Sequence, residues 1–233
     1  MIPLRDRNPT YSTPVVTIAL VAVNVLAFIY ELTLGELDLR RLVFTFGMVP
    51  ARVVAFPTAA HISFGNAFMP LFTSMFLHGG WLHLLGNMWF LWIFGDNVED
   101  RLGHFRFLLF YLLAGLGAGV VHTLFNLTSS LPAIGASGAV SGVMGAYLVL
   151  FPSSRVLTLI PAFFLFTVEL PAFVMILYWF FIQLVSGWAT TLVPVAERGG
   201  VAWWAHVGGF LVGIWLLYVF RPRPRKRAFY APW

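Results

Sequence analysis

Residues 135–145 read GASGAVSGVMG, a run of small side chains that opens an apolar segment. Within this run, Gly138 and Gly142 lie four positions apart. The last apolar segment of the chain carries Gly209 and Gly213 at the same spacing. Small residues four positions apart let two helix backbones approach closely inside a lipid bilayer. The pattern therefore predicts that these two segments are helices that pack against each other.

The composition of the whole chain is typical of a membrane protein. Of its 233 residues, 60% are hydrophobic and only 10% are charged, whereas a typical globular domain has about 25% charged residues. Such a chain cannot cover its surface with polar side chains, so its solvent must be lipid. Cysteine is absent, which excludes disulfides and thiolate metal sites.

Six apolar segments come near the length of about 20 residues that a bilayer requires. They are residues 14–30, 81–94, 105–125, 137–151, 171–190 and 203–220. We expect an all-α membrane protein, a bundle of six transmembrane helices over residues 14–220, between a cytoplasmic segment (1–13) and a basic cytoplasmic tail (221–233). The long connection 31–72 is expected to form short amphipathic helices in the interface plane. The apolar stretch 156–168 fits a re-entrant segment, a surface segment or an extension of the fifth span.

Charge bias orients the predicted bundle. With six spans both termini share one side, which would hold ten of the fourteen Lys and Arg residues against four on the other side. Loops rich in Lys and Arg stay in the cytoplasm, so we expect both termini there, with the tail attracted to anionic lipid headgroups. This topology signal explains the net charge of +5 without a nucleic-acid partner. Compactness and the basic tail favour a prokaryotic plasma membrane.

Ser137 lies in a tight turn, Gly135-Ala136-Ser137-Gly138, that leads into the fourth segment. The N–H groups in the first turn of a helix have no intrahelical acceptor, and such groups can bind the oxyanion of an acyl-transfer intermediate. Ser137 is therefore a candidate nucleophile. The alternative is a plain helix cap, which is the usual role of serine at the start of a helix.

His206, in the sixth segment, is a candidate general base. An ionisable residue inside a span is costly and is a functional candidate by default, and a neutral imidazole can accept the proton of a serine hydroxyl. Ser137 and His206 each lie 15 residues, counted inclusively, from the inner end of their segment, which is roughly 22 Å of helix. The two side chains are therefore expected at similar depth. The alternative is a His that bonds a backbone carbonyl between helices.

His83 and Asn87 lie four apart on the second segment and so share a helical face. Both can donate hydrogen bonds to a developing negative charge, although polar side chains in lipid also serve simply to join helices. His78, five residues upstream, is a candidate structural partner. A zinc site of His78, His83 and His206 is a further interpretation, but no H-E-x-x-H motif or nearby carboxylate accompanies them.

Two charged features lie outside this set. We interpret the cluster Asp96, Glu99, Asp100 and Arg101 as a cytoplasmic turn that forms a helix cap or an ion-pair group. Glu169 lies between apolar runs, and the sequence assigns it no role.

The motifs together resemble the rhomboid family of intramembrane serine proteases. Their order and their placement on the second, fourth and sixth segments fit that family, and the match runs from the first segment to the end of the sixth. The resemblance implies a six-helix bundle with a Ser–His dyad in a water-filled cavity that opens outward. The motifs are His78-x4-His83-x3-Asn87, Gly135-Ala136-Ser137-Gly138 and Ala205-His206-Val207-Gly208-Gly209.

By this resemblance Ser137 attacks the peptide carbonyl, His206 is the general base, and an oxyanion hole is formed by Asn87, His83 and the Ser137 N–H. Substrates would be single-pass membrane proteins, cut in or near their span within the lipid bilayer, and no metal or cofactor would be needed. Residues expected to be structural near the site are His78, Gly135, Gly138 and Gly209.

The chain departs from some relatives near the candidate site, and two alternative functions are open. Some relatives carry an aromatic residue four positions after the nucleophile, stacked on the catalytic His, where this chain has Ser141. The orientation of His206 would then rest on other contacts. A non-catalytic rhomboid-like protein that binds membrane clients is the alternative function, but it would not need the complete set of Ser137, His206, His83 and Asn87. A transporter would usually show repeat symmetry, which is not found.

Overall fold

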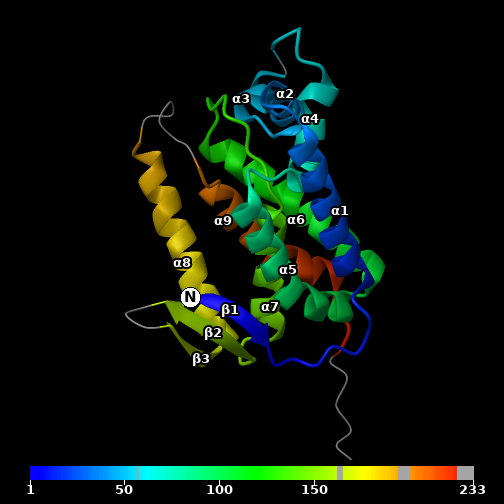
Figure 1. Ribbon diagram of the computed structural model, residues 1–233, viewed down its shortest axis with the longest axis vertical. Helices are drawn as coiled ribbons and strands as arrows, with labels where there is room; N and C mark the ends of the chain where they lie inside the picture. The colour runs from blue at the N-terminus through cyan, green and yellow to red at the C-terminus, as the bar shows by residue number, and fades with distance from the viewer. Residues whose placement is uncertain (57, 162–164, 194–199, 225–233) are drawn as a thin grey trace, which may run out of the picture.

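Six long helices form the body of the molecule (Figure 1). The computed structural model describes residues 1–56, 58–161, 165–193 and 200–224, so most of the predicted basic tail lies outside the described residues. Of the described helices, four are long and apolar enough to cross a membrane, α5 carries charges at one end, and α7 is a shorter apolar helix. The expected six-helix membrane bundle is therefore confirmed. The helices are α1 (Val15–Thr33), α5 (Trp81–Leu102), α6 (His104–Phe125), α7 (Ser137–Leu150), α8 (Ala172–Thr191) and α9 (Trp203–Phe220).

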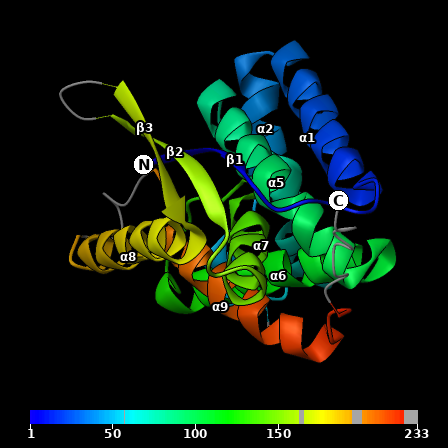
Figure 2. The same cartoon turned by 90° about the horizontal axis from the view of Figure 1, so that it is seen from below.

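Helix α7 lies at the centre of the bundle and packs against α5, α6, α8 and α9 (Figure 2). Its contact with α9 is made through glycines. A Cβ atom at Gly209 would overlap the carbonyl of Gly138, and one at Gly213 would overlap the backbone of Gly142. The two backbones touch only because these four side chains are hydrogen atoms, which confirms the helix pair predicted from the spacing.

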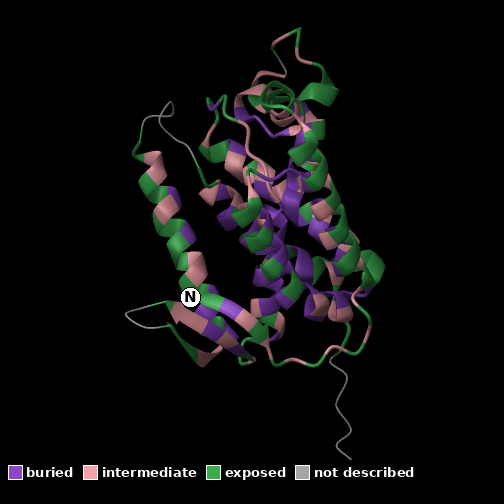
Figure 3. Cartoon of the chain, in the orientation of Figure 1, coloured by how far each residue is buried: buried purple, intermediate pink, exposed green. Residues whose placement is uncertain are grey.

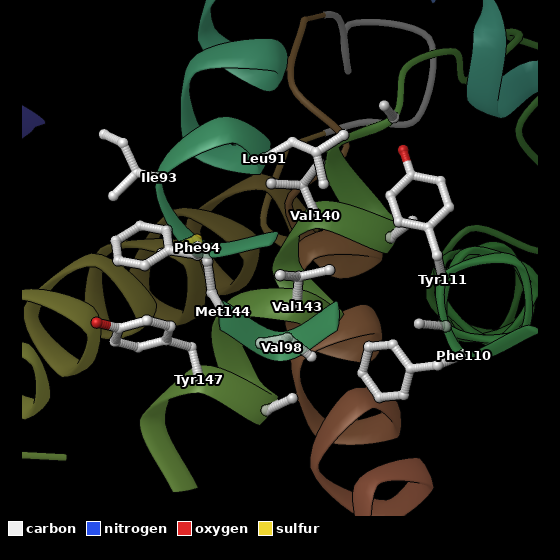
Figure 4. Close-up of a cluster of buried hydrophobic side chains, with 14 of the residues drawn as sticks. Leu91, Ile93, Phe94, Val98, Phe110, Tyr111, Val140, Val143, Met144 and Tyr147 are labelled. Carbon is white, nitrogen blue, oxygen red and sulfur yellow. The ribbon is translucent and has the colours of Figure 1, made fainter. Parts of the chain in front are cut away.

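The core of the bundle is filled by aromatic and aliphatic side chains between α5, α6 and α7 (Figure 4). Phe94, Tyr111 and Tyr147 are fully buried there, and the rings of Phe94 and Tyr147 meet edge to face with centroids 4.8 Å apart. Large apolar side chains are instead exposed along the outer faces of α1 and α8 (Figure 3), among them Leu26 and Trp188. These outer faces suit contact with lipid.

Helix α5 is longer than predicted and ends at Leu102. The charged cluster expected in a turn lies in its last turns instead. Glu99 is fully buried and accepts hydrogen bonds from the backbone N–H groups of Val16 (2.9 Å) and Thr17 (2.8 Å), at the start of α1. A carboxylate is stabilising at a helix N-terminus, so the helix continues until Glu99 reaches α1. The turn itself is formed at Gly103, whose φ is +80°.

The long connection after α1 forms short helices at one end of the bundle, as expected (Figure 1). They are α2 (Glu36–Phe46), α3 (Pro50–Ala55), α4 (Phe64–Thr73) and the 3₁₀ helix η1 (Ser74–Phe76). Met48, between α2 and α3, pairs in an isolated antiparallel bridge with Ala133, in the loop before α7. The bridge joins this region to the loop that leads into α7 and Ser137.

A three-stranded antiparallel sheet lies at the opposite end of the bundle, and the sequence reasoning missed it (Figure 1). Its strands are β1 (Ile2–Asp6), β2 (Arg155–Pro161) and β3 (Leu165–Pro171), in the order β1-β2-β3. The apolar stretch 156–168 is therefore a hairpin and no extension of the fifth span. Glu169 forms an ion pair with Arg7, which accounts for a carboxylate between apolar runs.

Candidate active site

A cavity of about 750 Å³ lies among the first turns of α5, α7 and α9. The four residues predicted to carry chemistry all line it: Ser137, His206, His83 and Asn87. These three helices begin at the same end of the bundle, opposite the sheet (Figure 1). Alternate spans therefore bring the three sequence motifs together.

Ser137 is the first residue of α7, and it follows a backbone conformation that glycine supplies. Gly135 has a φ of +122°, which side chains other than glycine rarely adopt. The cap position of α7 is held by Ala136, with no side-chain cap bond, and the part of the chain that the structure describes shows no hydrogen bond from the Ser137 hydroxyl. The interpretation of Ser137 as a plain helix cap is therefore wrong. Its hydroxyl is left at the cavity.

His206 is buried in the first turn of α9, and α8 holds its ring. Its Nδ1 atom lies 2.8 Å from Oε1 of Gln183. Two indole rings flank the imidazole, those of Trp179 (centroids 5.9 Å apart) and Trp203 (6.2 Å). Among the described residues no hydrogen bond joins Ser137 to His206, and catalytic hydrogen bonds often form only when substrate binds.

The imidazole of His83 presents a hydrogen-bond donor to the cavity. The backbone N–H of Gly79 points at His83 Nδ1 from 3.4 Å, so Nδ1 accepts and Nε2 carries the ring proton. The ring lies directly against Gly135, where a Cβ atom would come within 2.6 Å of His83 Nε2. Any larger residue at Gly135 would displace the imidazole from the start of α7.

Asn87 supplies a second donor, one turn further along α5. Its Nδ2 atom is buried and has no hydrogen-bond partner among the described residues. A buried, unpaired amide costs free energy, and a side chain that lines the cavity with a free donor is suited to an acceptor that arrives there. Asn87 Nδ2, His83 Nε2–H and the first N–H groups of α7 form a candidate oxyanion hole.

The remaining predicted residues support the site without lining the cavity. His78 is buried behind His83, with ring centroids 5.2 Å apart, and its backbone N–H donates to the carboxylate of Glu31 (3.2 Å). Gly138 and Gly209 make the contact between α7 and α9. Over the described ranges, no group of three His, Cys, Asp or Glu side chains could hold a metal ion, which leaves the zinc interpretation without a ligand set.

Sequence reasoning missed the contribution of α8 and α6 to the site. Gln183 and Trp179 contact His206 from α8, and His122 of α6 lines the cavity with a buried, unpaired Nδ1. A signal was present, because Gln183 is a polar residue within an apolar span and such residues are rare in lipid. Its partner could not be read from the sequence.

Comparison with known proteins identifies the fold that carries this site. Residues 65–223, which include all three motifs, match the family model described as the Rhomboid domain. The chain belongs to the rhomboid family. Together with its apolar helices, this membership makes it a multi-pass membrane protein.

Several curated rhomboid proteins are similar to this chain. RHOMBOID-like protein 6, mitochondrial, of Arabidopsis thaliana is 35% identical over 162 residues, which cover 70% of this chain and 47% of the relative. Rhomboid-like protein 11, chloroplastic, of the same plant is 45% identical over 71 residues, or 30% of this chain and 25% of the relative. Presenilin-associated rhomboid-like protein, mitochondrial, of Bos taurus is 29% identical over 156 residues, or 64% and 37%. The chain spans about half the length of these relatives or less.

In this rhomboid, the position four residues after Ser137 has a structural role. Ser141 is buried, and its hydroxyl donates to the carbonyl oxygen of Ser137 (2.6 Å). The aromatic contacts to His206 come from Trp179 and Trp203 instead. The orientation of His206 therefore rests on α8 and on its own helix.

Proposed function

We propose that the protein is an intramembrane serine endopeptidase, with Ser137 as nucleophile and His206 as general base. One observation carries the proposal: a hydroxyl, an imidazole and two unused donors from three separate helices face a single cavity. A protein that only binds membrane clients would have no use for this combination. Membership of the rhomboid family supports the proposal.

In the proposed reaction, Nε2 of His206 accepts the hydroxyl proton as Ser137 Oγ attacks the substrate carbonyl. The charge that develops on the carbonyl oxygen is stabilised by His83 Nε2–H, Asn87 Nδ2 and the N–H of Ser137. Donors aimed at such an oxygen typically contribute a factor of about 10²–10³ each to the rate. His206 returns its proton to the leaving amine, and water then hydrolyses the acyl-enzyme in the same manner.

The proposed substrates are single-pass membrane proteins, cut in or near their span. An intact helix holds its carbonyls in hydrogen bonds, so substrates with small or helix-breaking residues near the cut should be favoured. The charge bias supports a topology with both termini on the inner side of the membrane. The relatives named above are eukaryotic, and their names place them in mitochondria or chloroplasts, so they lend no support to a prokaryotic plasma membrane.

Cleavage of a model single-pass substrate in liposomes tests the proposal. The wild-type protein should cut, while Ser137→Ala and His206→Ala should both fail and remain folded. The matched controls Ser186→Ala and His61→Ala change the same residue types away from the cavity and should cut normally. Continued cleavage by purified Ser137→Ala would contradict the proposal. If no variant cuts, a fluorophosphonate probe decides: labelling of Ser137 keeps the nucleophile, and the absence of labelling favours the non-catalytic client binder.

A further inference from the structure

Gln183 is the only side chain in the described structure that hydrogen-bonds the imidazole of His206. It lies on α8, is buried, and places Oε1 2.8 Å from His206 Nδ1. A polar side chain buried within a span is costly unless it is paired, and this one is paired at both ends of its amide. The hydrogen bond to the second partner, the Trp179 carbonyl, determines which end of the amide faces His206.

The orientation of the Gln183 amide follows from that second partner. Its Nε2 atom lies 3.2 Å from the backbone carbonyl of Trp179, one turn earlier on α8. A carbonyl oxygen only accepts hydrogen bonds, so the –NH₂ group must face it. The oxygen of the amide is therefore the atom that faces His206. The reversed amide would set two oxygens against each other.

The tautomer of His206 follows in turn. Because Gln183 Oε1 can only accept, Nδ1 of His206 must carry the ring proton. In a neutral imidazole the lone pair then lies on Nε2, the atom that must accept the proton of Ser137. The other tautomer would have a protonated Nε2 and could not act as a base. Trp179 strengthens the arrangement, since the same residue whose carbonyl orients the amide also packs its ring on the imidazole (5.9 Å).

We propose that Gln183 is a positioning residue, which holds His206 in the Nδ1–H tautomer and so presents a basic Nε2 to Ser137. The proposal rests on the proposed function, because it assigns Gln183 a part in that reaction. Gln183 does not touch the reacting atoms and acts only through His206. Unlike a carboxylate at this place, a neutral amide orients the ring without adding charge to a buried site. The chemistry of the base therefore depends on α8 being docked against α9.

Two variants at position 183 and a control at position 184 separate orientation from packing. Gln183→Leu keeps the volume and removes the acceptor. We expect its kcat to fall about 10–100-fold with little change in KM, by analogy with the loss seen when the partner that orients a metal-bound His is removed. Gln183→Glu keeps the acceptor for His206 Nδ1 but loses the donor to the Trp179 carbonyl, so it should retain more activity than Gln183→Leu and less than the wild type. It should also move the acid limb of the pH–kcat profile to higher pH, because a nearby carboxylate favours the protonated ring. Leu184→Ala, on the lipid-exposed face of α8, is the control and should cut like the wild type.

Among the described residues, the other ionisable groups that line the cavity are His83 and His122. They are unchanged in all three variants, so a shift of the acid limb that is confined to Gln183→Glu belongs to position 183. If Gln183→Leu cuts within about twofold of the wild type, or if both Gln183 variants lose activity and melt early, the positioning role is wrong. The second result would mean that Gln183 only holds α8 in place.

A second readout does not depend on catalysis. Protein labelled with ¹⁵N at histidine should show the Nδ1–H tautomer for His206 at neutral pH, with the signal assigned from its loss in His206→Asn. Gln183→Leu should shift this signal towards the Nε2–H tautomer or a mixture. An unchanged tautomer in Gln183→Leu would overturn the inference. If the wild type does not cut but the tautomer responds to Gln183→Leu, the positioning contact stands and the proposed function fails.

Discussion

Substitution of Gly213 by alanine should separate α9 from α7 and destabilise the protein. A Cβ atom at this position would overlap the carbonyl oxygen and Cα of Gly142 and lie 2.6 Å from its carbonyl carbon. Backbone atoms cannot rotate away as a side chain can, so the two helices must move apart. Alanine gains up to about 1 kcal/mol of helix propensity over glycine, but overpacking of a close contact costs about 1–3 kcal/mol. A gap of even 0.5–1 Å along the interface also forfeits a quarter to a half of each dispersion contact.

The gain in propensity and the cost of overpacking together give a net loss of about 0–2 kcal/mol in the free energy of unfolding. The weakened dispersion contacts add to this loss, so we expect Gly213→Ala to be less stable than the wild type. The matched control is Gly86→Ala in α5, because no described atom beyond its chain neighbours and its own helix backbone lies within 4 Å of the Cβ position there. Without a clash, the control should raise the stability. Both variants can be measured by thermal unfolding in detergent micelles, followed by circular dichroism. If Gly213→Ala melts at or above the temperature of Gly86→Ala, the glycine contact between α7 and α9 is not as tight as described, and the packing argument fails.

Two further predictions concern charges at the end of the bundle that carries the sheet. Glu99→Gln puts an –NH₂ group among the N–H and hydroxyl donors of α1 that Glu99 now satisfies. It should cost about 2–4 kcal/mol in thermal unfolding, whereas Glu36→Gln, in an exposed ion pair, should change little. Burial raises the pKa of Asp6 to about 6, with a contribution from Asp96 and against the hydrogen bond from Tyr147. The folded protein thus holds a proton that the unfolded chain has released, so stability should fall as pH rises from about 4 through 6. After allowance for partial exposure, this decline in stability should amount to up to ~2 kcal/mol, and it should be absent in Asp6→Asn. Equal pH dependence of the melting temperature in Asp6→Asn and the wild type would contradict the prediction.

The features of the fold that could be predicted were those that depend on a local pattern in the sequence. The six apolar segments marked the six helices, since the length and apolarity of a span are properties of a single stretch. The glycine spacing identified α7 and α9 as neighbours before any contact was known. The three motifs placed Ser137, His206 and their donors near one another, because alternate spans begin on the same side of a membrane.

Other features could not be predicted, because each depends on two distant segments. The stretch 156–168 shows the apolar character of a span, and only pairing with β1, near residue 3, makes it a strand. The length of α5 depends on where Glu99 meets the start of α1. In the sequence Gln183 is an isolated polar residue, and its contact with His206 exists only because α8 packs beside α9.

The sequence by itself determined that this is a membrane protein, where its helices lie, which two of them touch through glycine, and which residues are candidates for acyl-transfer chemistry. Composition, hydrophobic length and small-residue spacing act within a segment, so they need no knowledge of the fold. Only the tertiary structure decided the proton positions of the candidate site. The tautomer of His83 is set by the hydrogen bond that it accepts from the Gly79 N–H, and that of His206 by the hydrogen bond that it donates to the Gln183 side-chain oxygen. A hydrogen bond is fixed by the positions of two atoms to within a few tenths of an ångström.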